Sequence, residues 1–150
     1  MKKFKFRYES VLKMRMDRED ALKNELAKLL AKRQTVVDEL DSLKARFLEY
    51  SNWVEEGLKS GNSSLQMHEI SSGKSYYRTN LSRTSEKLAR VDNDIEKAKK
   101  LLVDAMRERK VMEKLKEKDF QNYIEEYNKS EAKAIEEIVN YKSNKAGGEE

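Results

Sequence analysis

The sequence contains no proline and no cysteine, and only five of its 150 residues are glycine. Without proline, no position forces a helix to end through a missing backbone N–H or a ring clash with the preceding turn. Without cysteine, disulfides, thiolate metal sites and cysteine nucleophiles are excluded. The absence of cysteine also fits a reducing cytosol.

Histidine is scarce as well. The one histidine, His68, provides neither a histidine pair for a metal nor the base of a usual catalytic triad. Carboxylates are numerous, but carboxylates that face water need a cleft before they can act as acids or bases. The glycines form no phosphate-binding motif. We therefore expect no enzymatic activity, no metal site and no cofactor.

Long apolar runs are also missing. No run approaches the roughly 20 residues that a membrane-spanning helix needs. The basic start, Met1–Arg7, has no apolar stretch behind it and so differs from a signal peptide. We expect the chain to reach a membrane only through partners.

Charged residues, in contrast, make up 40% of the chain, with 32 Lys and Arg against 28 Asp and Glu and a net charge of +4. An ordinary globular domain has roughly 25%. The signs are mixed, as on the solvated faces of a coiled coil, and the aromatic residues do not interleave with a basic patch. We expect no nucleic-acid partner, and an apolar core no wider than the seam between two helices.

A regular apolar stripe runs through the first third of the chain. Its residues alternate in steps of four and three, and the mean of 3.5 keeps them on one side of a supercoiled helix. Arg33 occupies the one missing position, and farther upstream Arg15 and Glu19 fall on the stripe. The pattern predicts a helix over about residues 8–56. The stripe consists of Leu22, Leu26, Leu29, Val36, Leu40, Leu43, Phe47, Tyr50 and Val54.

The middle of the chain changes character, because three of the glycines and six serines lie between residues 57 and 75. Glycine and serine favour turns and helix caps. We expect the chain to reverse within residues 57–75.

A second stripe predicts a helix over about residues 76–141, followed by a disordered tail over residues 143–150. After Met112 the stripe shifts around the helix, as a stutter does in a coiled coil. The regular part consists of Tyr77, Leu81, Thr84, Leu88, Val91, Ile95, Ala98, Leu102, Ala105, Arg109 and Met112.

Neither stripe is stable in water alone, because an isolated helix needs a packed apolar face. The central bend makes the other helix of the same chain the nearest partner. The sequence therefore predicts an all-α fold: a long two-helix antiparallel coiled coil, or α-hairpin, forming a single domain over residues 1–142. A parallel dimer is the alternative that the sequence leaves open.

Two features allow more than one interpretation. Trp53 either packs near the bend or anchors a partner, since tryptophan is common at binding hot spots. The basic run over residues 107–118 is either a solvated face or a contact for an acidic partner. Arg109 on the stripe is not explained by a solvated face.

The opening Phe4–Arg15, the basic segment Arg107–Leu115 and a C-terminal signature together resemble the FliJ family of flagellar export stalk and chaperone proteins. Glu136 stands where the family more often has Asp, and Ala132 where Gln is common. The resemblance covers nearly the whole chain, although each motif is low in complexity. The signature residues are Asn128, Glu131, Lys133, Glu136, Glu137 and Ile138.

The resemblance implies a role in flagellum biogenesis and protein export, and so in chemotaxis. Such proteins are antiparallel coiled coils that insert into the hexameric flagellar export ATPase and promote its assembly and ATP hydrolysis. They also contact the membrane export gate protein and export chaperones. The implied location is cytoplasmic, peripheral at the inner face of the cell membrane.

Site residues carry over by the same resemblance. The export-gate contact would involve Leu43 and Tyr50, and Tyr77 and Leu81 match if the bend is aligned with one gap. A structural coiled-coil scaffold or adaptor, unrelated to an ATPase, remains the alternative function. The expected ATPase-ring contacts are Phe4, Phe6, Arg7, Leu12, Arg15, Arg107, Arg109, Lys110 and Lys114.

Overall fold

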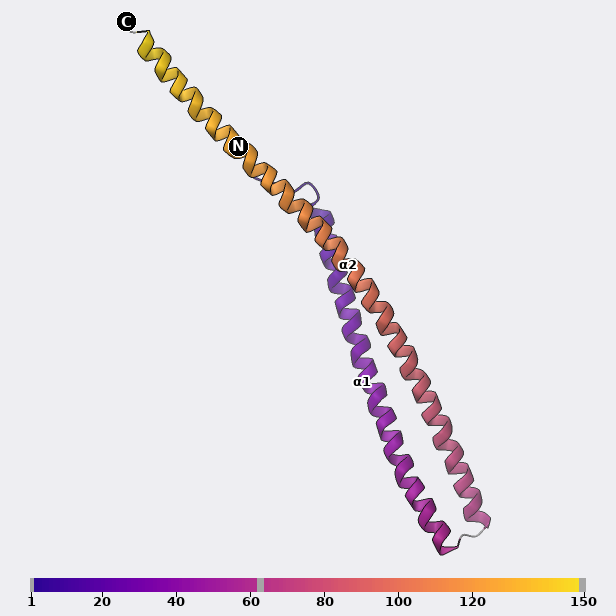
Figure 1. Ribbon diagram of the computed structural model, residues 1–150. Coiled ribbons are helices and arrows are strands. Elements are labelled where there is room, and N and C mark those ends of the chain that lie inside the picture. The colour runs from indigo at the N-terminus through magenta and orange to yellow at the C-terminus, as the bar shows by residue number, and fades with distance from the viewer. Residues whose placement is uncertain (1, 62–63, 149–150) are drawn as a thin grey trace. The chain divides into compact units, whose positions relative to one another are not determined.

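The computed structural model describes residues 2–61 and 64–148, and these residues form two long helices (Figure 1). Helix α1 covers Glu9–Ser60 and helix α2 covers Ser64–Gly147. No strand occurs among the described residues. The two helices pack antiparallel, so the predicted all-α coiled-coil hairpin is confirmed. No stretch within these residues is long and apolar enough to cross a membrane.

The connection between the helices is shorter than the sequence predicted. Helix α1 continues to Ser60 instead of ending near residue 56, and α2 begins at Ser64 instead of near residue 76. Gly61 has a φ of 78°, the left-handed conformation with which glycine commonly ends a helix. Asn62 and Ser63 lie outside the described residues. The serines after them are helical, because serine in a helix costs well under 1 kcal/mol.

The C-terminal boundary also differs from the predicted one. Helix α2 continues past residue 141 to Gly147, so residues 143–147 of the expected tail are helical. Nothing in this stretch breaks a helix before Gly147 and Gly148, which explains the extension. Glu149 and Glu150 lie outside the described residues.

The chain divides into two compact units. The terminal unit combines Met1–Glu19 with Asp104–Glu150, and the central unit is Asp20–Val103. Each unit pairs a stretch of α1 with a stretch of α2. The single domain over residues 1–142 stays a prediction.

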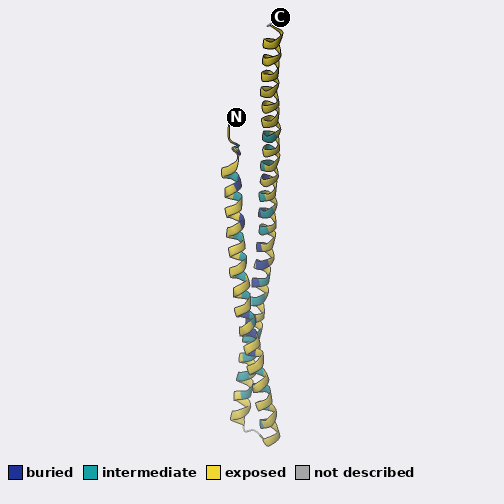
Figure 2. Cartoon of the chain, turned by 90° about the vertical axis from the view of Figure 1, so that its left-hand side faces the viewer, coloured by how far each residue is buried: buried dark blue, intermediate teal, exposed yellow. Residues whose placement is uncertain are grey.

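The central unit has its core around Val36, Val91 and Ile95, with three leucines packed against them. Every predicted stripe residue of this unit is buried or half-buried, which confirms both apolar patterns (Figure 2). Arg33, which occupies the stripe position where an apolar residue is missing, donates a hydrogen bond to Asp92 at 2.6 Å.

The terminal unit has its core at Phe6, Leu12 and Met112. Beyond Met112 the expected stripe is only partly covered: Leu115 packs on this core and Tyr123 contacts Phe4 and the Lys2 carbonyl, whereas Phe120 is exposed. After Ile124, every described residue of α2 is exposed (Figure 2). This C-terminal part of α2 has no intramolecular cover.

Candidate functional site

The N-terminal segment packs across α2 within the terminal unit. The Phe4 ring meets Phe120 edge-on, with centroids 5.2 Å apart, and lies 5.5 Å from Tyr123. The Tyr123 hydroxyl donates a hydrogen bond to the Lys2 carbonyl at 2.8 Å. Edge-to-face aromatic pairs contribute about 0.5–1.5 kcal/mol beyond their buried area. These contacts hold the non-helical segment against α2.

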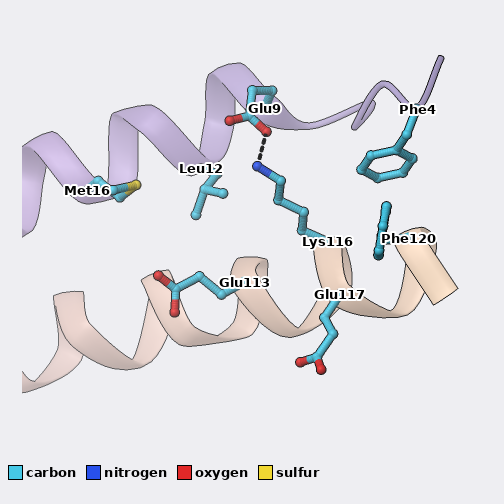
Figure 3. Close-up of a pocket in the computed structure, with 8 residues that line it drawn as sticks. All are labelled: Phe4, Glu9, Leu12, Met16, Glu113, Lys116, Glu117 and Phe120. Carbon is cyan, nitrogen blue, oxygen red and sulfur yellow. Dashed lines mark ion pairs between the residues drawn. The ribbon is translucent and has the colours of Figure 1, made fainter.

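An open groove of about 660 Å³ lies beside this aromatic cluster (Figure 3). Phe4 and Phe120 face each other at one end, and Lys116 reaches across the groove to Glu9 at 2.9 Å. The apolar lining is only partly covered, since Phe120 and Met16 are exposed. The groove is lined by Phe4, Glu9, Leu12, Met16, Glu113, Lys116, Glu117 and Phe120.

Four cations of the expected ring contact project from the terminal unit. Lys110 and Lys114 are exposed on α2, and Arg107 lies 4.0 Å from Asp104. The Arg7 guanidinium sits 5.5 Å from the centre of the Tyr8 ring. Exposed ion pairs contribute little, so these cations can exchange their present contacts for a partner's carboxylates at small cost.

Two other arginines of the expected ring contact make hydrogen bonds between the two helices of the terminal unit. Arg15 donates to the Glu108 carbonyl at 2.9 Å. Arg109 donates two hydrogen bonds of 2.8 Å to Glu113 and forms an ion pair with Glu19, which is buried. The hydrogen bond to Glu113, followed by the one to Glu19, raises the pKa of Arg109 above its ordinary value. The position of Arg109 on the stripe is thereby explained.

The remaining expected ring residues are packed to different extents. Phe6 and Leu12 are buried core residues, so their side chains hold the unit together, and Phe4 is half-buried. The structure brings all nine expected ring residues into the terminal unit, although they come from opposite ends of the sequence. Their roles as contacts stay predictions.

The four residues of the expected gate contact lie in the central unit. Leu43 is buried and Leu81 is half-buried. The rings of Tyr50 and Tyr77 lie 5.2 Å apart, and the Tyr50 hydroxyl donates a hydrogen bond to the Ile70 carbonyl. The two tyrosines thus stabilise the hairpin and are half-exposed. Their contact with a gate stays a prediction.

Trp53 packs near the bend, which is one of the two interpretations that the sequence left open, and its role as a partner anchor stays a prediction. Its ring lies 6.0 Å from Tyr50, yet half of its surface is exposed. Tyr76, 5.2 Å from Tyr77, is exposed as well and was not singled out from the sequence. Because consecutive residues of a helix point in different directions, the stripe alone gave no signal for Tyr76.

The sequence pattern also did not reveal two pairings. Glu19 was recognised on the stripe but was not paired with Arg109, and Phe120 and Tyr123 were not paired with Phe4. The signal for the first pair was present, since both charges interrupt otherwise apolar stripes. Predicting the second pairing required the path of the N-terminal segment. That segment is not helical, so the spacing of apolar residues says nothing about it. Among residues 2–61 and 64–148, no cluster of three or more His, Cys, Asp or Glu could hold a metal ion.

This geometry defines a class of protein: an antiparallel helical hairpin whose terminal unit displays cations and an open aromatic groove. Residues 4–148 match the family model described as Flagellar FliJ protein. The chain belongs to the FliJ family and is a component of flagellar protein export. No curated protein and no solved structure matched the chain.

Proposed function

We propose that this chain is a non-enzymatic stalk of the flagellar export apparatus, and that its terminal unit inserts into the hexameric export ATPase ring. The single observation that carries this proposal is the composition of the terminal unit. It joins residues 2–19 to the basic segment of α2, so that every expected ring residue lies on one compact body.

The charges of the terminal unit support a reversible contact. Arg107, Lys110 and Lys114 are exposed, and the one ion pair among them is long. Complementary charges across an interface speed association and fix orientation more than they add affinity. A stalk held this way can re-dock without breaking a strong bond.

The test measures ATP hydrolysis by the cognate hexameric ATPase while the purified chain is titrated in. We expect the chain to bind the ring and to raise turnover. The triple variant Arg107→Glu, Lys110→Glu, Lys114→Glu should weaken binding by about tenfold or more, because three attractions become repulsions.

The matched control reverses three exposed cations of α2 in the central unit: Arg90→Glu, Lys97→Glu and Lys100→Glu. Arg90 lies 3.7 Å from Glu86, so the control also contains one weak pair. It should stimulate the ATPase like the unchanged chain. A chain that neither binds the ring nor changes its turnover contradicts the stalk proposal, and equal losses in both triple variants contradict the assigned surface.

The central unit is proposed to contact the membrane export gate protein. The half-buried Tyr50 and Tyr77 lie next to the exposed Trp53 and Tyr76. Aromatic side chains are favoured as binding hot spots. Binding of the purified gate domain should fall in Trp53→Ala and remain in Leu48→Ala, a similarly exposed apolar residue on α1.

Export chaperones are the third proposed partner. Binding of export chaperones would require the chain to be in the cytoplasm. We propose that it is peripheral at the inner face of the cell membrane, attached only through the ring and the gate. Co-purification of chaperones with the tagged chain from flagellated cells tests this part. The same purification from cells without the tagged chain should yield no chaperones. Recovery of none of them with the tagged chain contradicts it.

A further inference from the structure

The C-terminal part of α2 carries an apolar face that the rest of the chain leaves uncovered. All described residues after Ile124 are exposed. At about 100° per residue, the large apolar side chains of this part fall on one side of the helix, and the opposite side carries charged and amide residues such as Lys133, Glu136 and Asn140. The exposed apolar residues are Tyr127, Ile135, Ile138, Val139 and Tyr141, with 36–69% of their surface accessible.

The middle of this face follows the coiled-coil spacing. Six positions alternate in steps of three and four and are called here the C-terminal stripe: Asn128, Glu131, Ile135, Ile138, Lys142 and Lys145. Two isoleucines occupy its centre, a carboxylate precedes them, and two ammonium groups follow. The stripe therefore has an acidic end, an apolar middle and a basic end along the helix.

This order of charges selects one way of pairing two copies. In an antiparallel pair, Ile135 of one copy faces Ile138 of the other, and the same register places Glu131 against Lys142 and Asn128 against Lys145. Each ion pair occurs twice, because the pair has twofold symmetry. In a parallel pair, Glu131 would face Glu131 and Lys142 would face Lys142, and like charges in contact are unfavourable.

We propose that the C-terminal stripe binds a second copy of this chain, antiparallel, with the isoleucines at the centre and Glu131 against Lys142. The charge complementarity of the stripe with its own reversed copy carries the proposal. The pairing also covers the two exposed isoleucines, and packing of apolar side chains is what stabilises helices in water. The stripe lies on the same terminal unit as the proposed ring contact, but outside the basic segment that carries the ring-contact cations of α2.

The first experiment measures the mass of the full-length chain by sedimentation equilibrium up to about 100 μM, where contacts of micromolar affinity are filled. We expect a reversible dimer. Glu131→Lys and Lys142→Glu should each weaken the dimer by about tenfold, since two attractions become two repulsions. The double variant Glu131→Lys, Lys142→Glu restores opposite charges and should restore the dimer.

The matched control places the same two changes on the polar side of the helix, as Glu137→Lys and Lys133→Glu. Neither should change the dimer. These exposed substitutions keep the helix, which circular dichroism checks, so a loss of dimer is not a loss of fold. A monomer at every concentration, or a dimer indifferent to the charge reversals, overturns the proposal.

The orientation is tested by cross-linking, because the chain has no cysteine of its own. Chains carrying Glu131→Cys are mixed with chains carrying Lys142→Cys and oxidised. Disulfides between unlike chains should exceed those between like chains. A preference for like chains shows parallel pairing and overturns the proposal, as does a monomer whose stripe instead captures an export chaperone.

Discussion

Arg109 of α2 and Glu19 of α1 form an ion pair inside the coiled-coil seam, 90 residues apart in the sequence. The Glu19 side chain is 5% exposed and that of Arg109 is 21% exposed. Glu113, one turn along α2, accepts two further hydrogen bonds from the same guanidinium. A carboxylate at this depth costs several kcal/mol unless a cation accompanies it, so the pair favours one alignment of α1 on α2.

Replacing Arg109 with Met should lower the free energy of unfolding, because the change removes the cation beside a buried carboxylate. Urea unfolding followed by circular dichroism measures the loss. Adding Glu19→Leu to Arg109→Met should recover most of it, since apolar pairs often replace buried ion pairs without loss. The control Arg107→Met, on an exposed pair, should cost less than about 0.5 kcal/mol. Equal costs for the two arginines would contradict this reading of the seam.

Replacing Arg33 with an apolar residue should stabilise the chain, in contrast to replacing Arg109. Arg33 pairs with Asp92 at 2.6 Å, but the two side chains are 43% and 47% exposed. Such a pair contributes at most about 1 kcal/mol, whereas a leucine at this half-exposed position buries about half of the apolar area that is worth about 1.5–3 kcal/mol on full burial. Arg33→Leu should therefore stabilise the chain slightly in the same urea assay. A destabilisation above about 1 kcal/mol would show that the pair contributes more than exposed pairs do.

Gly73 marks a close approach between the helices of the central unit. A Cβ on Gly73 would lie 2.7–2.8 Å from atoms of the Tyr50 ring, which is too close. Gly73→Ala should lower stability by about 1 kcal/mol, because overpacking outweighs the gain in helix propensity. In a Tyr50→Ala background the same change should instead stabilise by about 1 kcal/mol, since only the propensity remains. An unchanged sign in the two backgrounds, measured by thermal unfolding, would contradict the contact.

The Tyr127 phenol donates a hydrogen bond to Glu131, and this bond, followed by the carboxylate charge, raises the pKa of Tyr127. The protonated phenol is the favoured form, so this stabilisation is fully present below the ordinary tyrosine pKa and is lost as the pH rises through the raised one. Glu131→Gln should lower the pKa of Tyr127. The measurement is the phenolate absorbance between about pH 9 and 12, with the signal of Tyr127→Phe subtracted. Glu126→Gln is the control, and an equal shift there would contradict the pairing.

Much of the fold could be predicted from the sequence, because the residues that pack in a coiled coil recur with a short, regular spacing. The absence of proline and the alternating steps of three and four predicted two long helices and the stripe on each. The boundaries were less predictable, since serine and a single glycine weaken a helix by less than packing strengthens it. For that reason α2 begins 12 residues before its expected start at residue 76. The candidate site followed only from the family resemblance, because exposed cations on a helix look alike wherever they lie.

The sequence by itself determined that Leu40, Val91 and the other stripe residues would pack against another helix, since apolar side chains at this spacing share one side of a helix. The tertiary structure alone decided which residue of α1 faces which residue of α2. A repeating stripe looks the same after every shift of seven residues, so periodicity carries no information about alignment. The short connection, the close approach at Gly73 and the pair of Arg109 with Glu19 occur once each, and together they select a single register.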